Sequence, residues 1–203
     1  MPVTRFDLRG LAPAQGPSRR HVASVVDDAE AVHVLGPVPA LAAVLARLWR
    51  KERLPAVPVG WEPADDPASR RLAGDLGLGT GVARELPLVR DDHGGVLLDA
   101  GRIESAAGGR RTRLGAQAYH DDQRVVDGPV ARIDVRPDWT GADSISVAVT
   151  RRPVLGRAQR TSGRALQVAC APARVSRDGV VLDREVTRWT WYADDRVRWR
   201  LLP

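Results

Sequence analysis

Cysteine is almost absent from this 203-residue sequence, in which Cys170 stands alone. No disulfide can form within the chain, and neither a CxxC pair nor a four-cysteine zinc site is available. Long hydrophobic runs are absent too: the longest, residues 40–49, is interrupted by Arg47 and falls short of the roughly 20 apolar residues that a membrane-spanning helix needs. The first 30 residues also lack the apolar core of a secretory signal. These absences predict a cytoplasmic protein in a reducing compartment.

Lysine is equally scarce, because Lys51 is the one lysine among 31 Lys and Arg residues. The net charge of +6 indicates an anionic partner such as nucleic acid, a lipid headgroup or a nucleotide. The arginines are spread along the whole chain, however, so a solvated basic surface is the favoured interpretation. A hydrophobic fraction of 43% is enough for a buried core and excludes a charge-dominated disordered chain.

Proline and glycine divide the first half of the chain. Residues 1–20 contain both without apolar periodicity and are predicted to form an extended leader, with the ordered fold starting near His21. Residues 21–105 are predicted to form an α/β lobe with a short parallel sheet and flanking helices, because strand, helix and strand follow one another within about 30 residues. The predicted strands are residues 21–26, 31–35, 56–59, 85–89 and 96–98, and the predicted helices are residues 39–53 and 67–76.

The helical period disappears in the second half, and residues 106–203 are predicted to form an antiparallel, sandwich-like β lobe. Residues 106–123 are rich in glycine and arginine and favour a loop. Asp178-Gly179 predicts a tight hairpin turn, because both residues accept the positive φ angles that such a turn needs. The predicted strands are residues 130–135, 144–149, 165–170, 180–183, 186–192 and 196–202.

Three segments follow the order of motifs in a known kinase family. They are Pro58-Val59-Gly60 followed by LAGDLGL at residues 72–78, the strand pair at residues 89–98, and residues 163–203 with the Asp178-Gly179 turn, Thr190-Trp191 and the terminal Pro203. Together they resemble the bacterial diacylglycerol kinase catalytic domain, a relative of the sphingosine and NAD kinases. The resemblance implies a two-lobed fold that transfers phosphate from ATP, with Mg²⁺, to diacylglycerol or a similar lipid alcohol. The opening strand and the lipid-binding middle of the family are lost or shortened here, which predicts a truncated member.

The resemblance also implies where nucleotide would bind, namely at Gly36 and Gly60. The family's phosphate loop reads Gly-Gly-Asp-Gly-Thr, and its place here is taken by residues 36–40, Gly-Pro-Val-Pro-Ala. Such a loop aims backbone N–H groups at the anion, and Pro37 and Pro39 remove two of these donors. Val38 stands where the family has its aspartate. We therefore predict a degenerate kinase whose activity is impaired or lost.

Two carboxylates remain as candidates for a role in phosphoryl transfer. Asp178 is the candidate catalytic residue, but the family's acid two residues later is replaced by Val180, which cannot accept a proton. Asp143, in a segment similar to the family's Asp-Gly-x-Leu-Asp-Val strand, is the candidate Mg²⁺ ligand. A second acidic group, Glu62 with Asp65 and Asp66, is either a Mg²⁺ site or, as we favour, the cap of the helix that starts at residue 67.

The remaining motifs have simpler structural explanations. His33 is expected to be a structural side chain, and His93 and His120, each beside aspartates, are expected at solvated turns rather than on a metal. Trp189 and Trp191, interleaved with arginines, are expected to form a core stripe rather than a platform for nucleic acid.

The sequence therefore favours a degenerate lipid kinase. The alternative is a non-catalytic binding or regulatory module for an anionic lipid or a partner protein, located at the inner membrane surface. Nucleic-acid binding is a weaker option. We also expect that the C-terminal β edge can pair two copies into a homodimer.

Overall fold

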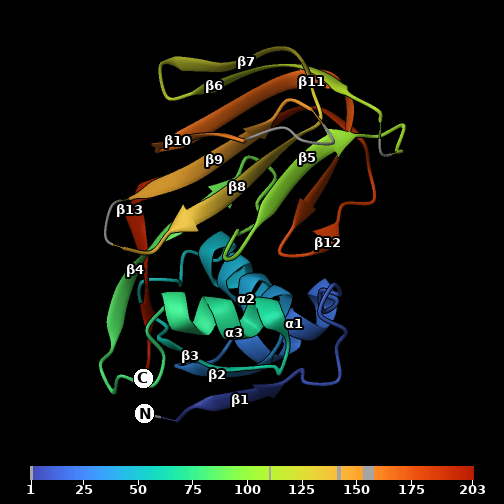
Figure 1. Cartoon of the computed structure of the whole chain (residues 1–203). Coiled ribbons are helices and arrows are strands. Elements are labelled where there is room, and N and C mark those ends of the chain that lie inside the picture. The colour runs from blue at the N-terminus through green and yellow to red at the C-terminus, as the bar shows by residue number, and fades with distance from the viewer. Residues whose placement is uncertain (1, 110, 141–142, 153–157) are drawn as a thin grey trace.

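The computed structural model describes residues 2–109, 111–140, 143–152 and 158–203. These residues form two lobes, which lie one above the other in Figure 1. The predicted fold class is confirmed: a short parallel sheet with helices is followed by antiparallel strands. In chain order the elements are β1 (Thr4–Asp7), α1 (Arg19–Val26), β2 (Val32–Gly36), α2 (Val38–Arg50), β3 (Val59–Pro63), α3 (Pro67–Asp75), β4 (Arg84–Asp91), β5 (Gly101–Ser105), β6 (Leu114–His120), β7 (Gln123–Val130), β8 (Arg132–Asp138), β9 (Ser144–Thr150), β10 (Gln159–Gly163), β11 (Ala165–Arg177), β12 (Val180–Val181) and β13 (Val186–Leu201).

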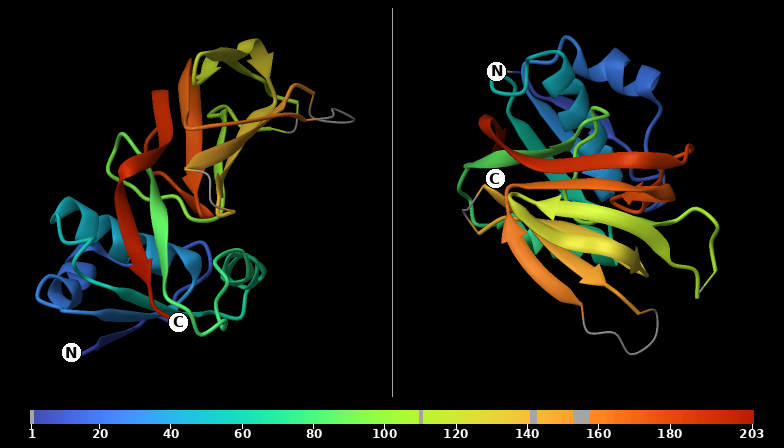
Figure 2. Two further views of the ribbon diagram at one scale, coloured as in Figure 1. Left: turned by 90° about the vertical axis from the view of Figure 1, so that its left-hand side faces the viewer. Right: turned by 90° about the horizontal axis from the view of Figure 1, so that it is seen from above.

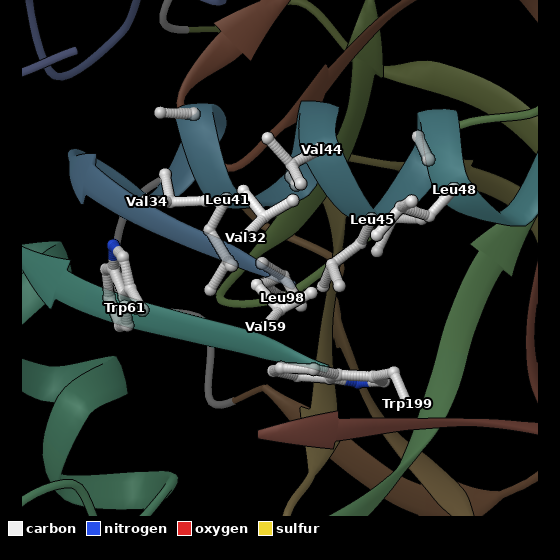
Figure 3. Close-up of a cluster of buried hydrophobic side chains, with 14 of the residues drawn as sticks. Val32, Val34, Leu41, Val44, Leu45, Leu48, Val59, Trp61, Leu98 and Trp199 are labelled. Atoms are coloured by element: carbon white, nitrogen blue, oxygen red, sulfur yellow. The ribbon is translucent and has the colours of Figure 1, made fainter. Parts of the chain in front are cut away.

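The α/β lobe is built on three parallel strands, β1, β2 and β3. Helix α2 begins directly after Pro37, which suits a first turn without N–H partners. Its apolar side chains recur at helical spacing and are buried against β2 and β3, as Figure 3 shows for Leu41, Leu45 and Val59. Each fully buried aliphatic side chain contributes about 1.5–3 kcal/mol to the stability of the folded state, so burial of this face holds α2 between the sheet and the β lobe.

The fold does not start near His21, as predicted, because residues 4–7 and 19–20 of the predicted extended leader lie in regular elements. Residues 4–7 form β1, which pairs in parallel with β2 and supplies an opening strand. The signal was present in the sequence, because the buried Phe6 and Leu8 alternate with exposed Arg5, Asp7 and Arg9.

Residues 21–26, predicted as a strand, lie in helix α1. Ser18 caps this helix by accepting a hydrogen bond from the His21 backbone N–H at 3.3 Å. Val22 and Val26, one helical turn apart, are buried in the core. Tertiary packing of this face outweighs the preference of valine for strands.

Two other segments also differ from the prediction. Residues 114–120, expected within a loop, form β6, in which every second residue from Leu114 to His120 is buried. Of residues 96–98, predicted as a strand, Val96 forms a single bridge to Arg90, and the backbone N–H of Leu98 donates to the carboxylate of Asp178.

Strand β13 connects the two lobes. The predicted strands 186–192 and 196–202 form this one strand, with an irregularity between Asp194 and Arg198. It pairs with β11 and β4, and its last residue, Leu201, pairs with Val59 of β3, so that it crosses from one lobe to the other (Figure 2). Figure 3 accordingly shows Trp199 beside the core of the α/β lobe. None of the helices in the described part of the chain is long and apolar enough to span a bilayer.

The register of β2 and β3 makes Gly60 sensitive to substitution. It pairs Gly60 with His33, and a Cβ at residue 60 would lie 2.5 Å from the His33 Nδ1 atom. We expect Gly60→Ala to lower the free energy of unfolding by about 1–3 kcal/mol, because the imidazole must move within a packed sheet. Gly115→Ala, in β6 with no atom within 4 Å of the new Cβ, is the matched control. Urea denaturation measures the stability of both variants. The additional substitution His33→Ala should restore stability to Gly60→Ala. Equal stability of the two glycine variants would contradict this account.

Candidate functional site between the two lobes

The turn from β11 to β12 points into the space between the lobes. Asp178 and Gly179 occupy it with φ angles of 48° and 85°, which confirms the predicted hairpin. The Asp178 backbone N–H donates to the carbonyl of Ala100 at 2.8 Å, and Gly179 lies against Pro13 and Ala14. The turn is therefore held from two sides by segments that are distant in sequence.

The Asp178 carboxylate fastens this turn to the segment before β5. It accepts hydrogen bonds from the backbone N–H groups of Leu98, Asp99 and Ala100 at 3.1, 2.7 and 3.1 Å. Only 7% of the residue is exposed. Loss of hydration on burial outweighs the three hydrogen bonds and raises the pKa of Asp178 to about 6.

Two cavities lie on either side of the Asp178 turn. The first, here called the arginine cavity, has a volume of about 440 Å³ and is lined by Arg19, Arg47, Arg50 and Arg177. The second, the carboxylate cavity, has a volume of about 470 Å³ and is lined by Asp66, Asp99 and Asp134. Asp178 lines both, and volumes of this size suit small ligands.

Every aspartate of the carboxylate cavity is already bound by protein groups. Asp99 accepts two hydrogen bonds from Arg71, at 3.0 and 2.5 Å, and a third from Arg136 at 3.3 Å. Asp134 pairs with Arg102 and Arg132, each at 2.7 Å. Sequence patterns do not predict the pairs with Arg71, Arg136 and Arg102, which are 28, 37 and 32 residues from their partners, whereas Arg132 and Asp134 are two residues apart on β8.

Asp66 completes this set as the cap of α3. It accepts from the backbone N–H groups of Ala68 and Ser69, both at 3.0 Å, which confirms the favoured capping role over a Mg²⁺ site. No group of three or more possible metal ligands occurs among the described residues. With its carboxylates engaged by arginines and N–H groups, the cavity does not fit Mg²⁺, which prefers free carboxylate oxygens.

The segment at the predicted phosphate loop is closed. All five residues from 36 to 40 are buried, and Val38 is 1% exposed. A Cβ at Gly36, whose φ is 150°, would lie 2.9 Å from the carbonyl oxygen of Leu8. The Gly36 carbonyl accepts from the Trp61 indole N–H at 3.0 Å. The five residues of this segment are thus packed into the protein, and Pro39 alone among them borders the arginine cavity.

The other predicted site residues lie apart from one another. Among the described residues that line the two cavities, neither Gly36 nor Gly60 is present, and Gly60 instead gives space to His33. Asp143 binds Arg198 with oxygen–nitrogen distances of 2.8 and 3.1 Å. Val180 does line the arginine cavity, as an aliphatic side chain beside Asp178.

The histidines and tryptophans are accounted for by packing. The expectation that His120 lies at a solvated turn is wrong: it is buried at the end of β6, where its Nδ1 lies 2.6 Å from the hydroxyl of Thr161, and burial lowers its pKa. His93 packs its ring on Trp189, with centroids 4.6 Å apart. Trp189 and Trp191 are both buried, which confirms the core stripe.

Solved structures with the same arrangement include two kinases. The chain superposes on a diacylglycerol kinase from Bacillus anthracis str. Sterne with a TM-score of 0.65 and 8% sequence identity, over 91% of this chain and 81% of that one. It superposes on an NAD kinase from Archaeoglobus fulgidus, solved in complex with ATP, with a TM-score of 0.58 and 11% identity, over 93% of this chain and 81% of that one. No protein-family model and no curated protein matches the sequence. The likeness establishes a fold of the diacylglycerol kinase and NAD kinase type.

The raised pKa of Asp178 makes a defined contribution to the pH dependence of stability. An unfolded aspartate titrates near 3.9, so the folded state binds the Asp178 proton more tightly than the unfolded state does between about pH 4 and pH 6. Stability from this group is full below pH 4 and is lost as the pH rises through 6.

Comparison with Asp178→Asn isolates this contribution from the other carboxylates. The free energy of unfolding of the natural protein, minus that of the variant, should fall by on the order of 2–3 kcal/mol between pH 4 and pH 7. Urea titrations at a series of pH values measure it. A difference that stays constant, or that grows with pH, would contradict the pKa given for Asp178.

Proposed function

We propose that this chain is a degenerate lipid-kinase-like protein that has lost phosphoryl transfer and retains the space between its lobes for ligand binding. The ancestral activity would be ATP-dependent phosphorylation of diacylglycerol or a related lipid alcohol. The observation that carries this proposal is the burial of residues 36–40, a segment that contains two prolines and in which Gly36 packs against Leu8.

The chemistry of the remaining side chains supports the same conclusion. Phosphoryl transfer depends on positioning of the triphosphate and on neutralisation of its charge, so it tolerates the loss of a phosphate cradle poorly. Asp178 is engaged by three backbone N–H groups, and its neighbour Val180 offers no base for a lipid hydroxyl. ATP and Mg²⁺ therefore have no part in the role that we assign.

The second candidate is a non-catalytic module for an anionic lipid or a partner protein. A specific observation favours the anionic ligand, namely the concentration of arginine side chains in one cavity between the lobes. Such a module would act in the cytoplasm and bind at the inner membrane surface, where acidic lipid headgroups attract basic proteins.

Burial of residue 38 is tested by restoring the family's aspartate. Val38→Asp would place a carboxylate without a partner in the core, so we expect a loss of about 3 kcal/mol or more in the free energy of unfolding. Val181→Asp, at a position that is 51% exposed, is the matched control and should change stability by less than about 0.5 kcal/mol. Tolerance of both substitutions in urea denaturation would indicate an open loop and overturn the proposal.

Loss of transfer is tested by a radiometric assay with ATP, Mg²⁺ and a panel of lipid alcohols. We expect the same background for the natural protein and for Asp178→Asn, and an active diacylglycerol kinase added in trace amount shows that the assay is sensitive enough. Turnover by the natural protein that Asp178→Asn abolishes would overturn the proposed loss of activity.

A further inference from the structure

Four guanidinium groups from three parts of the chain converge on the arginine cavity. Arg19 comes from the first turn of α1, Arg47 and Arg50 from the last turns of α2, and Arg177 from the end of β11. The cavity thus gathers positive charge from both lobes.

Two of these arginines are held by carboxylates. Arg47 forms an ion pair with Asp27. Arg177 lies 2.5 Å from the carboxylate of Asp91, which is fully buried. These two pairs fix the walls of the cavity and neutralise their own charges.

The other two arginines have no carboxylate partner in the described part of the chain. Arg50 donates to the backbone carbonyl of Gly94 at 3.0 Å, and neither Arg50 nor Arg19 takes part in an ion pair there. Asp178 also lines the cavity, but its oxygens accept from the backbone of Leu98, Asp99 and Ala100. Both arginines are exposed to solvent, so an anion can reach them.

Crowding of like charges is costly for Arg50. Partial loss of hydration, and then repulsion from Arg19, Arg47 and Arg177, lowers the pKa of its guanidinium. An anion placed between these groups would relieve the repulsion and would replace the lost water with charged hydrogen bonds.

Part of the cavity lining is apolar. It consists of small side chains on one face of α2 and of valines from neighbouring segments, namely Ala42, Ala43, Ala46, Val22, Val96 and Val180. A ligand that fills the cavity must therefore combine an anionic end with an apolar body.

We propose that the arginine cavity binds a phosphate monoester that carries a short apolar group, with Arg19 and Arg50 binding the phosphate. A phosphate monoester has a charge of about −1.5 to −2 at pH 7 and three acceptor oxygens, which matches two unpaired guanidinium groups better than a carboxylate with a single charge does. The inference rests on the proposed binding role but not on the loss of phosphoryl transfer, because it requires neither ATP nor turnover.

Calorimetric titration with hexyl phosphate, hexanoate and inorganic phosphate tests the ligand class. Hexyl phosphate should bind more tightly than either of the other two. Arg19→Gln and Arg50→Gln should each weaken its binding about tenfold or more, because each removes a charged hydrogen bond. Arg20→Gln and Lys51→Gln are matched controls, since each removes one adjacent exposed charge that does not line the cavity, and should leave the affinity unchanged. Melting temperatures of all four variants show whether they are folded.

Vesicles with and without phosphatidate distinguish the source of the phosphate group. Flotation of the natural protein with phosphatidate vesicles, together with its loss in Arg19→Gln and Arg50→Gln, supports the site with a lipid ligand. Binding of hexyl phosphate without flotation supports the site with a free phosphate ester. Equal affinity for hexanoate and hexyl phosphate, or binding that the control variants weaken as much as the cavity variants do, would overturn the proposal. Turnover in the kinase assay would refute the loss of activity and leave this result unaffected.

Discussion

The burial of residues 36–40 is the constraint on which the proposed loss of phosphoryl transfer depends. A Cβ at residue 36 would lie 2.9 Å from the Leu8 carbonyl oxygen, so the residue after β1 packs against the last residue of β2, just before α2 begins. A helix start can bind an anion only where its first N–H groups are open. Here the residues of that start are buried, and Pro37 and Pro39 contribute no N–H group at all. The fold is thus of the diacylglycerol kinase and NAD kinase type, while the segment at the proposed phosphate loop is buried and lacks two backbone N–H groups.

The two cavities that Asp178 lines differ in their balance of charge. On one side, Asp99 and Asp134 are balanced by arginines from α3 and from the β lobe. On the other, arginines outnumber their carboxylate partners, and apolar side chains form part of the same lining. Asp178 separates the two cavities and is itself committed to backbone N–H groups. Ion pairs neutralise the carboxylates of the first cavity, and the excess of arginines in the second is the basis for the anionic ligand that we propose.

Local patterns in the sequence predicted the parts of this structure that local forces determine. The spacing of apolar residues in α2, the aspartate before Pro67 and the Asp178-Gly179 turn each specify an element within a few residues. The sequence did not reveal what Asp178 would bind, because its partners are 78 to 80 residues away. Helix α1 was missed because its valines favour strands, and only packing in the core decides otherwise. The arginine cavity could not be predicted either, because its four arginines come from three separate elements that only the tertiary fold brings together.

Amide hydrogen exchange at Gly36, Val38 and Ala40 measures most directly whether the start of α2 is closed. Buried amides in a packed core exchange only through unfolding or local opening. The structure predicts slow exchange at these residues in the free protein, and no further change when ATP and Mg²⁺ are added. Fast exchange that becomes slow on addition of the nucleotide would contradict the closed start of α2 and would restore the phosphate loop that we conclude is lost.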